Sequence, residues 1–204
     1  MQHGLAQDRG LEAVAYAYRE QKFVPAETTW EKPQGKNPPL VMKKHFQLVG
    51  RGVGVVVGCG TFPTWNTYPG LFAALATGNA VIVKPHPATV LPMAITVRVF
   101  RQVLRAAGFD PNLVTLALDT VDDPIGKVLV QHPRTAIVDF TGSVRFGQWV
   151  ERHAHPALAF TETAGCNTVV LTAADDLDAA LRSLATTLCM FSAQMCTSPQ
   201  NIYV

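Results

Sequence analysis

The side chain best suited to covalent chemistry in this sequence is the thiol of Cys196. It lies in the segment Cys189-Met-Phe-Ser-Ala-Gln-Met-Cys-Thr-Ser-Pro-Gln-Asn-Ile-Tyr-Val204, between an apolar helical run that ends at Phe191 and a β-like segment that begins at Asn201. A tight connection between a helix and a strand would hold the thiol rigidly and aim it at a substrate. Cys196 is therefore the first candidate for a reactive group, with the thiolate as the reactive form.

Glu162 is the candidate for acid–base chemistry. It lies in the string Thr161-Glu-Thr-Ala-Gly165, directly after the apolar run Ala157–Phe160. Desolvation in such surroundings favours the protonated carboxyl and would make Glu162 a usable base. No adjacent lysine or arginine offers to pair with it. We therefore expect a catalytic or ion-pairing reason for this carboxylate.

A glycine-containing string between a predicted strand and a predicted helix is a candidate phosphate site. The residues that would form it are Phe140, Thr141, Gly142, Ser143 and Gly147. The glycines would allow close approach of the backbone, and the N-terminus of a helix offers free N–H groups and a positive dipole end to a pyrophosphate. The alternative is a glycine turn in which Ser143 only caps the helix.

Lys84 ends a predicted strand and is followed by Pro85-His86-Pro87, where the prolines prevent the strand from continuing. A lysine at this position can reach a phosphate or a ribose hydroxyl. Alternatively, it extends its charged end from a buried strand into water. His86 has no recognisable partner, and we expect it to be solvated.

Short apolar runs alternate with amphipathic segments from Phe46 onward, a pattern typical of β-α-β units. The predicted strands are Val53–Val57, Ala80–Val83, Val114–Leu118, Ala136–Phe140 and Thr168–Leu171. The predicted helices are Pro69–Ala76, Pro92–Ala107, Pro124–Gln131, Ser143–His153 and Leu177–Phe191, the last capped by Asp175 or Asp176. The pattern predicts an α/β fold with a doubly wound, mostly parallel sheet, whose ligands lie where strands end and helices begin.

The N-terminal part, residues 1–44, is predicted to hold one short helix, Gly10–Lys22, and then an extended, proline-rich connector over Pro25–Pro39. The nucleotide-binding α/β domain is expected over residues 45–162, and the beginning of a second, catalytic domain over residues 163–204.

Composition excludes several classes of protein. Hydrophobic residues make up 48% and charged residues 16% of the chain, which indicates a soluble, cytoplasmic globular protein. A net charge of +2 is too small for a nucleic-acid or anionic-membrane surface, and no apolar run is long enough to span a membrane. The four cysteines have no CxxC spacing, so we expect neither a metal site nor a disulfide framework.

The ordered motifs resemble those of the aldehyde dehydrogenase superfamily. They are Thr61-Phe-Pro, Ala74-Leu-Ala-Thr-Gly-Asn-Ala-Val-Ile-Val-Lys-Pro85, Phe140-Thr-Gly-Ser143, Glu162-Thr-Ala-Gly165 and Gln194-Met-Cys196. The resemblance is closest to the phenylacetic acid degradation (PaaN-type) branch and runs from about Gly10 to Val204. It implies a Rossmann-like cofactor-binding domain.

The resemblance also implies roles for individual residues. Cys196 would attack the carbonyl carbon of an aldehyde, and Glu162 would activate the water that hydrolyses the resulting thioester. Lys84 would bind the adenosine ribose or its phosphate, while Ser143 and the Gly142–Gly147 turn would hold the pyrophosphate. The substrate implied is a small-molecule semialdehyde from ring-opened phenylacetyl-CoA, possibly still CoA-linked.

Two positions depart from the pattern of that family. Thr61 stands where most members have an asparagine that donates a hydrogen bond to the developing oxyanion, so the threonine hydroxyl would take that place. Pro87 stands where the family has a glutamate that holds the ribose hydroxyls. Loss of this carboxylate would remove repulsion toward a 2′-phosphate, so we expect NADP to be preferred, with NAD as the alternative.

Family members continue well beyond the nucleophile, whereas this chain ends at Val204. The sequence is therefore interpreted as a fragment of an enzyme whose full-length form is a homo-oligomer. Two other functions stay open: a catalytically inert nucleotide-binding module, and a cysteine-dependent hydrolase or acyl transferase that uses no nicotinamide.

Overall fold

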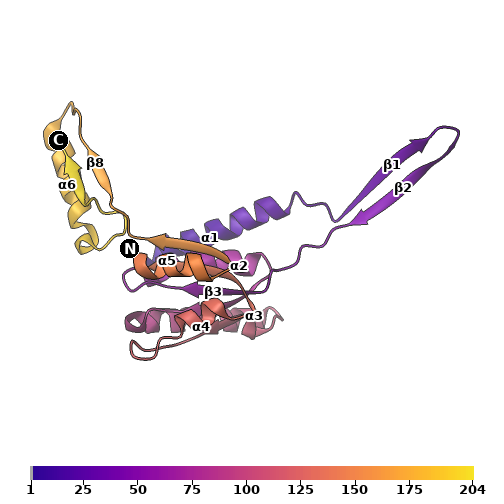
Figure 1. The fold of residues 1–204 in the computed structure, drawn as a ribbon, viewed down its shortest axis with the longest axis horizontal. Helices are drawn as coiled ribbons and strands as arrows, with labels where there is room; N and C mark the ends of the chain where they lie inside the picture. Colours follow the sequence, from indigo (N-terminus) through magenta and orange to yellow (C-terminus); the bar gives the residue numbers. More distant parts are fainter. Residues whose placement is uncertain (1) are drawn as a thin grey trace.

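A parallel five-stranded sheet forms the body of the protein in the computed structural model, which describes residues 2–204 and their side chains from Gly4 onward (Figure 1). The strand order is β5-β4-β3-β6-β7. The bounds are β3 Val53–Val57, β4 Ala80–Lys84, β5 Val114–Leu116, β6 Thr135–Gly142 and β7 Leu158–Thr163. The chain starts in the middle of the sheet and winds outward in both directions, so the predicted doubly wound α/β class is confirmed.

Helices cover both faces of this sheet. The bounds are α2 Pro63–Ala76, α3 Val90–Ala106, α4 Gly126–Gln131 and α5 Val144–His153, with short 3₁₀ turns η1 Pro87–Thr89 and η2 Pro111–Leu113. Alternate residues of β3 face opposite sides: Val56 packs in a cluster with α2 and α3, and Val55 in a cluster with α4 and α5. Burial on both faces explains why these strands are almost continuously apolar in sequence.

The turn between α2 and β4 is fixed by Asn79, which is 3% exposed. Its side chain accepts hydrogen bonds from the N–H groups of Arg51 and Gly52, at 2.6 and 3.1 Å, and donates to the carbonyl of Ala74. This one amide therefore connects the segment that leads into β3 with the end of α2.

The N-terminal part differs from the prediction in two ways. Helix α1 (Gln2–Gln21) begins before the predicted Gly10 and packs against α2, where a Cβ on Gly10 would lie 2.9 Å from the ring of Phe72. The predicted connector is wrong, because β1 (Glu27–Gln34) and β2 (Asn37–His45) form an antiparallel hairpin that projects from the body (Figure 1). Pro33 lies at a register irregularity, and a two-stranded ribbon leaves outer N–H groups unpaired, so its prolines are tolerated.

The prediction that the fifth strand, Thr168–Leu171, belongs to the main sheet is also wrong. β8 (Thr168–Val170) pairs with β9 (Asn201–Tyr203) in a separate two-stranded sheet, beside α6 (Leu177–Cys189) and η3 (Met190–Ala193). The outer position of the main sheet is taken by β7, an edge strand with mainly exposed side chains. Its apolar residues Leu158 and Phe160 are 42% and 57% exposed.

Helix boundaries were predicted within a few residues except at the starts of α1 and α2. Helix α2 starts at Pro63 rather than Pro69, and Pro69 lies inside it. A proline inside a helix removes one backbone hydrogen bond, and this misled the prediction. Asp176 caps α6 as expected, since its side chain accepts from the N–H of Ala179 at 2.8 Å. No helix within residues 2–204 is long and apolar enough to cross a membrane.

Candidate functional site

A cleft of about 1050 Å³ lies at the carboxyl ends of the sheet strands, where the fold rule places ligands. It collects residues that are far apart in sequence. Of the candidates singled out from the sequence, it is lined by Thr61, Lys84, Phe140, Thr141, Gly142, Ser143, Glu162 and Cys196. Pro87 and Gly147 do not line it. Loops after every strand of the sheet contribute, so the topology brings the thiol, the carboxylate and the lysine to one place.

The phosphate candidate lies where β6 passes into α5. Ser143 is the N-cap of this helix, and its hydroxyl accepts a hydrogen bond from the N–H of Phe146 at 3.3 Å. The free N–H groups of the first turn therefore face the cleft edge that Gly142 and Ser143 line. Both roles weighed for Ser143 are compatible with this position, because a cap leaves neighbouring N–H groups available to an anion.

Gly147 has a different role from the predicted one. It lies within α5 rather than in a turn, and a Cβ there would meet Thr163 Cγ2 at 2.6 Å. The glycine lets α5 approach β7 closely. Of the residues predicted for the Gly142–Gly147 phosphate turn, Gly142, Ser143 and Phe146 line the cleft, whereas Gly147 does not.

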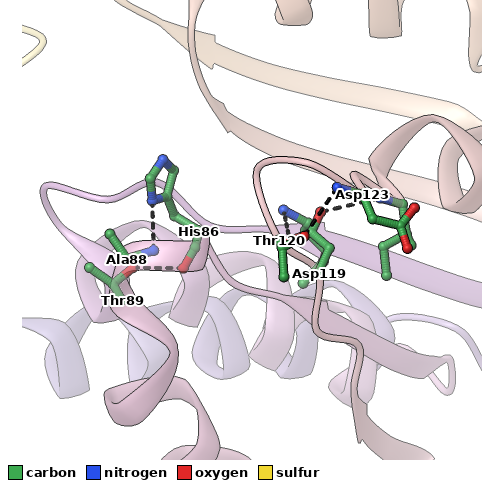
Figure 2. Close-up of polar contacts among 8 residues, drawn as sticks. His86, Ala88, Thr89, Asp119, Thr120 and Asp123 are labelled. Atoms are coloured by element: carbon green, nitrogen blue, oxygen red, sulfur yellow. Dashed lines mark hydrogen bonds and ion pairs between the residues drawn. The ribbon is translucent and has the colours of Figure 1, made fainter.

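Lys84 is the last residue of β4 and is almost buried. Its Nζ lies 2.8 Å from Asp119 Oδ1, and the two side chains are 10% and 2% exposed. Figure 2 shows the loops that follow β4 and β5, with His86 on one and Asp119 on the other. Sequence reasoning missed Asp119 because it extended the β5 strand to Leu118 and did not treat the joint after it as a site. The rule that ligands lie beyond strand ends would have found it.

The loop after β4 places His86, rather than Pro87, at the cleft. Pro87 begins η1, and His86 Nδ1 accepts from the N–H of Ala88 at 3.2 Å (Figure 2). His86 is exposed, as expected, and it also caps this turn and lines the cleft.

Cys196 reaches the cleft from the C-terminal segment, on the loop between η3 and β9. Its thiol is exposed. The loop is positioned by Asn167, whose amide donates to the carbonyls of Cys196 and Ser198 at 2.6 and 3.1 Å. The chain enters the loop through a left-handed turn, with φ of 51° at Phe191 and 58° at Ala193. The rigid connection expected from the sequence is thus built by a side chain outside the predicted segment.

Glu162 lies at the end of β7 and lines the cleft, but it is exposed. The desolvated environment expected for it is therefore wrong, because β7 is an edge strand. Its Oε2 accepts a hydrogen bond from Asn66 Nδ2 at 3.2 Å. Asn66 lies in the first turns of α2 and also lines the cleft, so its role exceeds that of a helix-start residue.

A carboxyl with a shifted pKa lies next to Glu162, on the neighbouring strand. Burial raises the pKa of Asp139 from 3.8 to about 7, and the charge of Glu162 adds to this shift. Asp139 faces α2, where a Cβ on Gly70 would meet Asp139 Oδ2 at 2.6 Å. The single charged residue within the predicted strand Ala136–Phe140 was the sequence signal for this group.

Thr61 and Cys59 lie together on the loop after β3. Cys59 Sγ is 3.6 Å from Thr61 Oγ1 and 3.4 Å from Asn66 Oδ1, and all three residues line the cleft. A hydroxyl and an amide are therefore both available on the side of the cleft where Glu162 lies. Over residues 2–204, no group of three or more histidine, cysteine, aspartate or glutamate side chains is arranged to hold a metal ion.

Comparison with known proteins agrees with this arrangement. Residues 11–204 match the family model described as the Aldehyde dehydrogenase family. A crystal structure of an NAD-dependent aldehyde dehydrogenase from Burkholderia multivorans is 59% identical and superimposes with a TM-score of 0.93, over 98% of this chain and 36% of that one.

Curated relatives are more distant. The 1-pyrroline-5-carboxylate dehydrogenases of Anoxybacillus flavithermus and Bacillus cytotoxicus are 32% and 30% identical, over 78% and 76% of this chain. The matches cover 31% and 30% of those enzymes, so the chain spans about a third of the length of the curated relatives it matches. Because the family model matches nearly the whole chain and the cleft assembles the motif residues, this chain belongs to the aldehyde dehydrogenase family.

Proposed function

We propose that this chain forms the dinucleotide-binding part and the nucleophile of an enzyme that oxidises an aldehyde to a carboxylic acid, with NAD or NADP as hydride acceptor. The observation that supports this most is the shared cleft. It brings together Cys196, Glu162 and Ser143 from three different parts of the sequence. The name of the Burkholderia multivorans relative, an NAD-dependent aldehyde dehydrogenase, supports the same assignment.

The residues on the described cleft fit a dinucleotide. Ser143 and the N–H groups at the start of α5 would hold the pyrophosphate, and Lys84 with Asp119 would hold the adenosine ribose. Asp119 Oδ1 is buried and has no donor with hydrogen-bond geometry among the described residues, although Lys84 Nζ makes a charge contact with it. An oxygen in this state is suited to a ligand hydroxyl. When bound, the dinucleotide supplies the hydride acceptor.

Cys196 carries out the covalent chemistry in this proposal. Its thiolate adds to the carbonyl carbon, a C–S bond forms, and the carbonyl oxygen takes the electron pair. The backbone N–H of Cys196 and the hydroxyl of Thr61 stabilise that oxyanion. Loss of hydride from the tetrahedral carbon leaves a thioester on Cys196.

Glu162 then completes the reaction by removing a proton from water. The resulting hydroxide adds to the thioester carbon, the C–S bond breaks, and the acid leaves with the thiolate restored. Exposure of Glu162 allows it to return its proton to solvent. The hydrogen bond from Asn66 orients the carboxylate toward the cleft.

The substrate we propose is a semialdehyde from ring-opened phenylacetyl-CoA, free or CoA-linked, and the whole protein is proposed to be a homo-oligomer. The motif resemblance supports both, while the curated relatives are named 1-pyrroline-5-carboxylate dehydrogenases. Comparison of kcat/KM for the phenylacetyl-derived semialdehyde and for 1-pyrroline-5-carboxylate decides between the two substrates. A higher kcat/KM for 1-pyrroline-5-carboxylate would overturn the phenylacetyl assignment.

The whole polypeptide that carries this chain is the material for the test of catalysis. With aldehyde and NAD or NADP, Cys196→Ala should lower the rate of dinucleotide reduction by a factor on the order of 10³ or more. Cys189→Ala is the matched control, since Cys189 is exposed and does not line the cleft. Equal rates in the two variants would contradict the proposed nucleophile.

Glu162→Gln separates the two halves of the reaction. It should still release a burst of about one reduced dinucleotide per site, followed by a slow steady state, because the thioester forms but is hydrolysed slowly. Release of acid from a thioester without any dinucleotide would instead favour the cysteine hydrolase. Binding of dinucleotide without turnover would favour the inert module.

A further inference from the structure

The ion pair between Lys84 and Asp119 is a feature of the cleft that the motifs do not account for. Lys84 is the final residue of β4, while Asp119 lies beyond β5, brought alongside by a hydrogen bond from the N–H of Ala117 to the carbonyl of Val83 at 2.9 Å. Both side chains line the cleft. This hydrogen bond extends the pairing of the two strands by one residue and brings the start of the loop that carries Asp119 beside the end of β4.

The position of this carboxylate is fixed from two sides. Asp119 Oδ2 accepts a hydrogen bond from the N–H of Ile125 at 3.2 Å, and Oδ1 makes the 2.8 Å charge contact with Lys84 Nζ. The side chain of Asp119 is only 2% exposed, and no donor among the described residues is directed at Oδ1 with hydrogen-bond geometry. Oδ1 is thus a buried acceptor with capacity for one more hydrogen bond.

The charge of the pair determines what it can bind. The positive charge of Lys84 is already balanced, so it is not a free cation for a phosphate. A ribose diol, by contrast, can donate a hydroxyl to a carboxylate oxygen and accept from a lysine ammonium. Carboxylates that hold the ribose 2′-hydroxyl characterise NAD sites, whereas a 2′-phosphate calls for an arginine.

The cleft has no arginine that could bind a 2′-phosphate near this pair, among the residues that the structure describes. Among the described residues that line the cleft, the basic side chains are Lys84, Lys127 and His86, and none is an arginine. Lys127 Nζ lies over the ring of Trp149, 5.2 Å from its centroid. His86 Nδ1 is occupied by the N–H of Ala88. A 2′-phosphate at this place would therefore meet the Asp119 carboxylate without an uncommitted cation to offset it.

We propose that Asp119, acting with Lys84, binds the adenosine ribose and makes NAD the preferred dinucleotide over NADP. This inference rests on the proposed function. The sequence favoured NADP because Pro87 stands where the family has a carboxylate. In the structure, Asp119 places a carboxylate at the cleft from a different loop, so that reason no longer applies. Asp119 is a specificity-determining residue that contacts the cofactor and takes no part in the chemistry.

Calorimetric titration tests the inference without any turnover. The probes are NAD and NADP, together with their adenosine halves 5′-AMP and 2′,5′-ADP. The wild-type protein should bind NAD about tenfold or more tightly than NADP, and the two halves should follow the same order. Asp119→Asn and Asp119→Ser should reduce this ratio to about one, since both remove the negative charge.

The matched control is Asp123→Asn, on the same loop but exposed, with its N–H bonded to Thr120 (Figure 2). It should keep the wild-type ratio. Equal or tighter binding of NADP by the wild-type protein would overturn the inference, whether or not the Asp119 variants fold. An unchanged ratio in folded Asp119 variants would do so as well. Failure of all four probes to bind would overturn the proposed function itself.

Discussion

The sheet body and the C-terminal segment that carries Cys196 contain similar apolar residues in very different environments. Val55, Leu71 and Val83 in the body are fully buried. In the C-terminal segment, none of the described residues of α6 is buried, and Leu181 and Ile202 are 48% and 39% exposed. The side of the cleft that is proposed to bind the ribose and the phosphates is thus fixed by core packing.

The thiol side is held in another way. It depends on the Asn167 amide, which bonds the Cys196 loop, and on an edge-to-face contact between Phe62 and Phe191, with centroids 5.3 Å apart. The proposed dinucleotide site and the proposed nucleophile are therefore positioned by different parts of the structure. Changes in the body should affect stability strongly, whereas changes in the C-terminal segment should affect mainly the position of the thiol.

The largest expected difference comes from the same substitution in the two regions. Leu71→Ala removes a side chain that is 0% exposed and should lower the free energy of unfolding by about 3 kcal/mol. Leu181→Ala, at 48% exposure, should cost less than about 1 kcal/mol. Urea unfolding followed by circular dichroism measures both. Similar losses of unfolding free energy in the two variants would mean that α6 is as tightly packed as the body, and would contradict the difference between the two regions.

A smaller change in the free energy of unfolding, which depends on pH, is expected from substitution of Asp139 in the sheet body. Its pKa is raised to about 7 by burial, with a further contribution from Glu162. The folded protein therefore binds this proton more tightly than the unfolded chain, and the associated stability is full below about pH 4 and lost as the pH rises to about 7. Asp139→Asn should be about 1–2 kcal/mol more stable than the wild type at pH 8.

The same variant should show no such gain near pH 4, where both side chains are neutral. Thermal unfolding across the pH range measures the difference. Asp122→Asn, at an exposed position on the loop before α4, is the control and should change the unfolding temperature less than the substitution at buried Asp139 does. A gain for Asp139→Asn that does not change with pH would contradict the assigned ionisation.

The smallest effects concern the helix caps of the two regions. Ser143→Ala and Asp176→Ala each remove a side chain that caps a helix, α5 in the body and α6 in the C-terminal segment. Each cap contributes about 1 kcal/mol to its own helix. Because α5 is packed on the sheet, loss of Ser143 should lower the global unfolding free energy. Loss of Asp176 should instead appear as faster amide exchange confined to α6, and a global effect there would contradict local stability.

The sheet strands were predictable from sequence because burial on both faces gives continuous apolar runs, as in Val53–Val57. Edge strand β7 and the hairpin β1–β2 were not predictable in the same way, since their side chains are mainly exposed and their short apolar stretches are interrupted by polar residues. Pro33 and Pro69 also misled the prediction, because structural context tolerates each proline.

The residues of the candidate site also divide into those that the sequence predicted and those that it did not. Cys196, Lys84 and Ser143 lie in recognisable motifs at strand or helix ends, and the cleft contains all three. Asp119, Asn167 and Asn66 act through contacts with residues distant in sequence, and the register and packing of the folded chain bring these partners together. Gly147 shows the converse, since a motif glycine proved to serve packing against Thr163.

The rate of alkylation at each cysteine shows whether the Cys196 thiol and the dinucleotide share one cleft. Mass spectrometry would follow Cys59, Cys166, Cys189 and Cys196 with and without saturating NAD. Cys196 should react fastest in the free protein, and NAD should change its rate by about threefold or more while leaving exposed Cys189, outside the cleft, unchanged. Equal labelling of all four thiols, with no effect of bound NAD on Cys196, would contradict the account.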